Sequence, residues 1–274
     1  MTDYEQIFDY LRKNKSVLML EKKASMKCAD AIETHYVKTI DDKTMAVKAI
    51  EDTEIPENGK FNIKVAINTT NIIDSHMDMH VNGIWKKSLK EIKNLYLFQE
   101  HKYSFEYVIS DSVKASTVLM SWKDLGYNYD GLTEVLVFDA EVNPDDNELM
   151  AKKYKQNKVK NHSVGMRYVK IELAMNSDSR WDEEEKKVWD KYYPIVVNKE
   201  VADERGYFWV VTEAKIVEGS AVPIGSNQAT PTLNISEAKS TQEEPAEQSQ
   251  VKNEPQITES ELKRVLEEKL NIKF

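Results

Sequence analysis

The sequence predicts an α+β protein that is mainly β, with helices around a β-rich body and a disordered C-terminal tail. Short alternating or β-branched runs recur between turn signals through the middle of the chain. Helical spacing of apolar residues is confined to a few flanking segments, and regular alternation of strands with helices is absent. The stretch SEAKSTQEEPAEQSQVKNEPQ is polar and has no aromatic residue, so it cannot offset the entropy lost on ordering.

Composition narrows the class of protein. The chain has 274 residues, of which 41% are hydrophobic, and a net charge of -9. It can therefore bury a sizeable core, and its acidity disfavours nucleic acid as a partner. The single Cys28 cannot form an intramolecular disulfide or a multi-cysteine zinc site, which favours a reducing compartment. Neither a signal peptide nor an apolar run of about 18 residues is found, so we expect a cytoplasmic protein without a membrane partner.

The elements follow in order along the chain. Residues 1–31 are predicted to form a helical arm, because Tyr4, Ile7, Phe8 and Leu11 recur at three- and four-residue spacing. The body, residues 32–233, changes to strand-like runs. Strands are predicted at 35–40, 45–50, 61–67, 96–98, 105–109, 113–120, 134–142, 163–173 and 207–222.

One helix of the body has clear boundary signals. Asn143 is placed as a capping residue before a proline and two acids, so the helix should run to about residue 156. Its core face is predicted to carry Leu149, Met150 and Tyr154. The lysines from 152 to 160 are interpreted as a solvated face rather than a binding patch.

The C-terminal part is divided into a linker and a helix. Residues 234–260 are predicted to be a disordered linker. Residues 261–274 are predicted to be an amphipathic helix, opened by the capping-box pair Thr258 and Glu261. A helix this short is marginal alone in water, so it either docks through its apolar face or frays.

Two constellations of residues could carry chemistry. Asp74, His76, Asp78 and His80 alternate, and on a strand they would share one face and could hold a divalent ion. A rigid strand, however, sets alternate side chains in a line rather than around a point. A solvated loop is the competing interpretation of this segment.

The second constellation is a nucleophile with a base. Ser163 begins a long alternating strand, and Gly165 on the same face would leave room for substrate beside the hydroxyl. A serine needs an imidazole to take its proton, and His101, after a short apolar run, is the better candidate. His162 should point to the opposite face. Glu218, at the end of the last long strand, could orient the imidazole, and the competing interpretation is a surface carboxylate.

Four segments together resemble the prohead maturation proteases of tailed bacteriophages. They are INTTNIIDSHMDMHVNGIWKKSLKE, FQEHKY, KNHSVGMRYVK and VEGSAVPIGSNQATPT, and they span about residues 68–232 in the order of that family. The resemblance implies a fold similar to herpesvirus assemblin, a closed or nearly closed β-barrel flanked by helices, over residues 32–233. It assigns Ser163 as nucleophile, His101 as base and Glu218 as third member, and makes Asp74 and Asp78 structural.

The resemblance also implies a biological setting. The substrates would be the phage major capsid protein, its scaffold and the chain's own tail, cleaved in the prohead within the host cytoplasm by a protease that needs no cofactor or metal and that could form a homodimer. Amides near Gly165 or Gly219 are candidates for receiving the oxyanion.

Two departures from the family pattern stand out, Trp85-Lys86 after Gly83 and an insertion at 176–206, expected to be a helix that buries Trp181, Val188 and Trp189. Two rival functions stay open. One is a catalytically silent capsid-assembly scaffolding protein of the same fold. The other is a metal-dependent hydrolase that uses His76 and His80.

Overall fold

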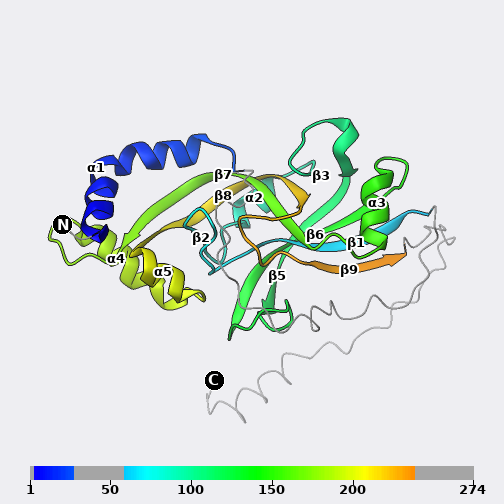
Figure 1. The fold of residues 1–274 in the computed structure, drawn as a ribbon. Coiled ribbons are helices and arrows are strands. Elements are labelled where there is room, and N and C mark those ends of the chain that lie inside the picture. Colours follow the sequence, from blue (N-terminus) through cyan, green and yellow to red (C-terminus); the bar gives the residue numbers. More distant parts are fainter. Residues whose placement is uncertain (1–2, 28–58, 238–274) are drawn as a thin grey trace, which may run out of the picture. The chain divides into compact units, whose positions relative to one another are not determined.

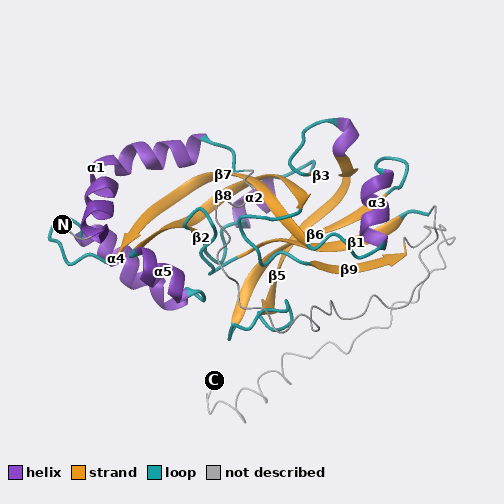
Figure 2. Cartoon of the chain, viewed as in Figure 1, coloured by secondary structure: helices purple, strands orange, loops and turns teal. Residues whose placement is uncertain are grey.

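The computed structural model describes residues 3–27 and 59–237, and these form an α+β unit with more strand than helix (Figures 1 and 2). The strands predicted at 35–40 and 45–50, most of the linker and the terminal helix lie outside the described residues. Within the described ranges the strands form two open sheets, and no closed barrel is found there. No helix of these ranges is long and apolar enough to cross a bilayer.

The first sheet has four antiparallel strands in the order β5-β6-β1-β9. Its strands are β5 (Ser112–Ser121), β6 (Leu132–Val142), β1 (Phe61–Thr69) and β9 (Thr232–Glu237). The strand β9 occupies the first four residues of the predicted linker. The linker was predicted to begin too early, because Ile235 pairs with Ile63 and is buried in the core.

The second sheet has five strands and is built around β8 (Tyr207–Val222). On one side β8 pairs antiparallel with β7 (Asn161–Met175). On its other side it pairs parallel with two short strands, β2 (Asp78–His80) and β3 (Leu97–Gln99). The strand β3 continues the sheet to β4 (Val108–Ser110), which follows the 3-10 turn η1 (Phe105–Tyr107), so only the second half of the strand predicted at 105–109 is extended.

One apolar core joins the two sheets. It contains side chains from β1 and β6 together with side chains from β3, β7 and β8, among them Phe61, Ile63, Phe138, Leu97, Leu173 and Phe208. Polar groups also join the second sheet to the first sheet and to the segment that precedes β9. The Ser110 hydroxyl donates to the Glu141 carbonyl at 2.6 Å, and the His162 amide donates to the Thr230 carbonyl at 3.1 Å. Packing of this kind fixes the position of β8, which carries much of the candidate site.

The predicted N-terminal arm is confirmed as a helix over α1 (Asp3–Ala24), which packs on β7 with Leu11 buried. The helix α2 (Lys86–Glu91) follows Gly83, whose φ of 85° suits glycine. The predicted start of the next helix is wrong, because α3 (Glu148–Lys155) is capped by Asn147. Asn143 instead accepts from the Asp145 amide in a preceding turn.

The core face of α3 also differs from the prediction. Met150 and Tyr154 are buried as expected, but Leu149 is exposed and Ala151 takes its place in the core. Positions 150, 151 and 154 share one side of the helix by three- and four-residue spacing, and Leu149 lies outside this side.

The insertion between β7 and β8 forms two α-helices and a 3-10 turn. They are α4 (Glu183–Tyr192), η2 (Tyr193–Ile195) and α5 (Lys199–Arg205). Trp189 is buried as predicted, Val188 is half-buried, and Trp181 is exposed. The burial predicted for Trp181 is wrong, because this residue precedes α4 and its ring packs instead under the Arg180 guanidinium at 4.6 Å.

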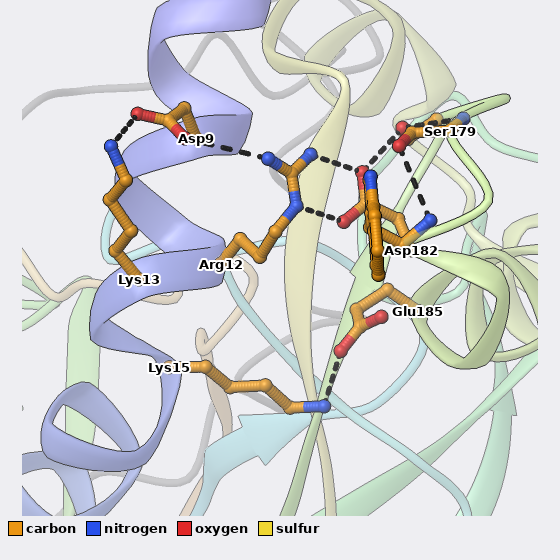
Figure 3. A network of polar contacts seen from close by, with 9 residues as sticks. Asp9, Arg12, Lys13, Lys15, Ser179, Asp182 and Glu185 are labelled. Atoms are coloured by element: carbon orange, nitrogen blue, oxygen red, sulfur yellow. Dashed lines mark hydrogen bonds and ion pairs between the residues drawn. The ribbon is translucent and has the colours of Figure 1, made fainter.

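Charged side chains tie α1 to this insertion (Figure 3). The Arg12 guanidinium donates two hydrogen bonds to the Asp182 carboxylate, at 2.7 and 2.8 Å, and Lys15 pairs with Glu185. The Ser177 hydroxyl also donates to Asp182, at 2.6 Å. The bonds from Arg12 and Ser177 hold the pKa of Asp182 below its usual value.

Candidate active site

The structure places Ser163 and Glu218 on one face of the second sheet and pairs His101 with Glu218. Ser163 in β7 lies directly opposite Ser220 in β8, and Gly165 lies opposite Glu218. Residues paired in this way project from the same face of a sheet. His101 follows β3, which borders β8 on its other side. Across the sheet, the strand order β7-β8-β3 therefore gives the order predicted nucleophile, predicted acid and predicted base.

His101 and Glu218 form a close buried pair. The His101 Nδ1 atom lies 2.7 Å from the Glu218 Oε1 atom, and the two side chains are 7% and 2% exposed. An ionised carboxylate can only accept hydrogen bonds, so Nδ1 carries the proton that is donated to Glu218. When the ring is neutral, the other nitrogen, Nε2, is an acceptor. It is buried and has no hydrogen-bond partner among the described residues.

Ser163 keeps limited access to solvent at 7% exposure. Its hydroxyl makes no hydrogen bond to any residue of the described ranges, His101 included. Catalytic hydrogen bonds are often long before substrate binds and shorten in the complex. The site therefore contains an acceptor nitrogen, His101 Nε2, and a hydroxyl, that of Ser163, which are not hydrogen-bonded to each other.

Two polar residues that the sequence analysis did not assign complete the cluster around Glu218. The Ser220 hydroxyl donates to Glu218 Oε2 at 2.7 Å, and the Tyr103 hydroxyl donates to Oε1 at 3.3 Å. The spacing Glu218-x-Ser220 on a strand is the signal that places Ser220 on the same face. Tyr103 lies in a loop, where no periodicity identifies it.

Gly165 has a different role from the one predicted. A Cβ atom built there would lie 2.1 Å from Glu218 Oε1, far inside van der Waals contact. The space beside Gly165 is thus filled by the carboxylate and is not open to substrate. The glycine is required because the Glu218 carboxylate, which contacts His101 through Oε1, lies directly over Gly165 of β7.

The turn that carries His101 has an unusual backbone. Both Glu100 and His101 have φ near 54°, in the left-handed region that non-glycine residues rarely adopt. Two hydrogen bonds to β8 hold it: the Glu100 amide donates to the Ala221 carbonyl at 2.9 Å, and the His101 amide donates to the Ser220 hydroxyl at 3.2 Å. Strained backbone of this kind persists only where its surroundings fix it.

His162 points away from this cluster, as the alternation predicted. It is fully buried, with Nε2 2.9 Å from the Tyr154 hydroxyl and Nδ1 3.0 Å from the Thr230 carbonyl. Burial lowers the pKa of His162 to about 4. Its partners assign it to the interior between α3 and β7.

The candidate metal ligands Asp74 and His76 lie in a turn and not on a strand. Asp74 Oδ1 accepts from the His76 and Asp78 amides, at 2.8 and 3.0 Å. Burial, followed by the neighbouring Asp78 charge, raises the pKa of Asp74 to about 7. The side chain of His76 is directed to a hollow of about 520 Å³ that it shares with Lys22 and other residues.

Asp78 and His80 belong to a buried polar chain that begins at α1. Lys22 pairs with one Asp78 oxygen, and the Tyr168 hydroxyl donates to the other at 2.8 Å. His80 lies between Tyr168, at 3.3 Å, and Asn68, at 2.9 Å, and its burial lowers its pKa to about 4. Across the described ranges no three His, Cys, Asp or Glu side chains converge as metal ligands.

One further expectation, that the Gly219 amide could receive an oxyanion, is corrected by position. The Gly219 amide donates to the Tyr96 carbonyl at 3.1 Å and is therefore engaged, so it is not available for an oxyanion. The insertion at 176–206 joins β7 to β8 beyond the Met175–Tyr207 pair. At about 3.3 Å a residue, this end is about 40 Å along β7 from Ser163, so the insertion does not shape the site.

When the chain is compared with protein-family models, curated proteins and solved structures, no significant match is found.

Proposed function

We propose that the chain is a serine endopeptidase of the prohead-maturation type, with Ser163 as nucleophile, His101 as base and Glu218 as the orienting acid. The observation that carries this proposal is the buried His101–Glu218 pair, whose Nε2 atom has no hydrogen-bond partner within 3–27 and 59–237, next to the strand pair that bears Ser163. A buried acceptor without a partner is costly in a folded protein. In the proposed mechanism, His101 Nε2 is the atom that accepts the Ser163 proton.

The mechanism follows from these positions. His101 Nε2 takes the proton of the Ser163 hydroxyl as the oxygen attacks a peptide carbonyl. The imidazolium then gives this proton to the leaving amine, and the acyl-enzyme is released by water. Glu218 holds the proton on Nδ1 throughout and stabilises the charged ring. Because the carboxylate is itself held by two hydroxyl donors, it can orient the ring without moving.

The proposed substrates are segments of a phage major capsid protein and its scaffold, and the chain's own tail beyond Glu237. The sequence of 238–260 is polar and has no aromatic residue, which is the composition of segments that proteases cleave readily. We also propose the nearly closed barrel of that family for the two sheets. Their contacts at Ser110–Glu141 and His162–Thr230 are the two places at which such a barrel would close.

Intact-mass spectrometry over time tests the proposal. Wild type, Ser163→Ala and the control Ser116→Ala, at an exposed position of β5, are incubated at high concentration. Tail fragments are expected in wild type and the control and not in Ser163→Ala. A fluorophosphonate probe should label Ser163 in the same two proteins.

Three results would contradict the proposal. Tail loss that continues unchanged in Ser163→Ala would assign the cleavage to another group. Absence of both labelling and cleavage, also on co-expression with a capsid protein, would favour the silent scaffolding protein. Stoichiometric zinc in the purified protein would favour the metal-dependent hydrolase.

A further inference from the structure

We propose that Ser220 is a positioning residue that fixes both the acid and the base of the site. This inference rests on the proposed function, because it concerns the orientation of His101 by Glu218. Ser220 is fully buried in β8, between Ser163 in β7 and Phe98 in β3, its two paired neighbours. It touches the side chain of one member of the site and the backbone of another.

The single hydroxyl of Ser220 makes two hydrogen bonds in opposite senses. Its proton is donated to Glu218 Oε2 at 2.7 Å, and its oxygen accepts from the His101 amide at 3.2 Å. The first bond prevents rotation of the carboxylate, so that Oε1 stays directed at His101 Nδ1. The second holds the left-handed turn from which the imidazole projects.

Removal of this hydroxyl would disturb both ends of the His101–Glu218 pair. Glu218 Oε2 would be a buried carboxylate oxygen without its donor, and the His101 amide would lose its acceptor. The turn would keep one of its two bonds to β8, from Glu100 to Ala221. The carboxylate could then rotate, and the imidazole could exchange between tautomers or turn away.

The same contacts distinguish Ser220 from the nucleophile. Its proton is already committed to Glu218, and its side chain has no exposure to solvent. Ser163, which lies opposite, retains exposure and has no hydrogen bond to the described residues. Two serines that face each other across β7 and β8 thus have different tasks.

The experiment compares Ser220→Ala with Ser110→Ala. Ser110 is also buried in the second sheet, but its hydroxyl donates to the Glu141 carbonyl away from the site. Each variant removes one buried hydroxyl that makes more than one hydrogen bond, so Ser110→Ala controls for a general loss of stability. Nitrogen-15 NMR of histidine-labelled protein reads the protonation of Nδ1 and Nε2, and His101 is assigned with His101→Gln.

We expect wild type and Ser110→Ala to show His101 with Nδ1 protonated, and Ser220→Ala to show a mixture of the two tautomers. For Ser220→Ala, the kcat of tail cleavage should fall about 10- to 100-fold, and KM should stay unchanged. Ser220→Thr, which keeps the hydroxyl, should recover the wild-type spectrum.

An unchanged His101 spectrum in Ser220→Ala would overturn the inference, as would an equal change in Ser110→Ala. The NMR measurement does not depend on turnover. If Ser163→Ala shows that the proposed protease activity is wrong, the spectra still decide whether Ser220 sets the His101 tautomer.

Discussion

Substitution of Gly165 by alanine should disable the candidate site although Ser163, His101 and Glu218 themselves are not substituted. The added Cβ would lie 2.1 Å from Glu218 Oε1, 2.8 Å from Cδ and 2.9 Å from Cγ. Distances under 3.0 Å are essentially never observed for a Cβ atom, so the whole carboxylate must move. The oxygen nearest the new methyl is the one bonded to His101, which makes displacement of that bond unavoidable.

The size of the effect follows from what is lost. A hydrogen bond to a charged group contributes about 1.5 to 3 kcal/mol, so the free energy of unfolding should fall by that order. Loss of the orienting carboxylate in a serine-protease triad lowers kcat by about 10⁴-fold, which sets the upper limit for the fall in activity. The two quantities are measured by urea unfolding and by the rate of tail loss in intact-mass spectra.

A double-mutant cycle with Glu218→Ala separates this mechanism from a general defect in β7. With the carboxylate removed, the new methyl has nothing to displace, so Gly165→Ala should cost little more in that background. Equal costs in both backgrounds would refute the reasoning. So would a Gly165→Ala protein that keeps the wild-type cleavage rate.

Three further predictions concern stability. Burial holds the pKa of His162 at about 4, below the 6.5 of the exposed ring, so its contribution is fully present above pH 6.5 and is lost as pH falls toward 4. The loss reaches about 3 kcal/mol. In urea unfolding from pH 7.5 to 4.5, the slope of the free energy of unfolding against pH should be lower in His162→Gln than in wild type, by the equivalent of up to one proton. An unchanged slope would contradict the buried neutral ring. Asp182→Asn should lower the free energy of unfolding by about 1 kcal/mol, because the two-bond contact with partly exposed Arg12 is weakened, and this loss should shrink at high salt. Asn147→Ala should cost about 1 kcal/mol by removing the cap on the Met150 amide, whereas Asn143→Ala should cost less; the opposite ranking in thermal melts would restore the earlier helix start.

Much of the strand content was predictable from the sequence because alternation is a local signal. The prediction for 207–222 matches β8 at both ends, and those for β1, β5, β6 and β7 differ by a few residues. The short strands β2 and β9 were missed. Each depends on a partner distant in the sequence, Trp209–Val211 for β2 and Phe61–Val65 for β9, and not on its own composition.

The site shows the same division between local and distant information. Residue types and the family resemblance selected Ser163, His101 and Glu218, and their catalytic roles stay a prediction. The structure pairs His101 with Glu218 and places Ser163 on the face of β7 and β8 that bears Glu218. The roles of Gly165 and Ser220 required the register between β7 and β8. Register is set by the whole sheet, so a side chain that crosses to the neighbouring strand, as Glu218 does, has no signature in its own segment.

The distance between the site and the far end of the β7-β8 ribbon has a consequence for engineering. The positions of Ser163, Gly165, Glu218 and Ser220 depend on strand pairing near one end, while the helices at 176–206 close the other. An exposed part of the connection can therefore carry a fused domain without a change in the register of β7 and β8 near Ser163 and Glu218. Its exposed turn at Trp181, ahead of α4, is a natural point at which to attach a reporter.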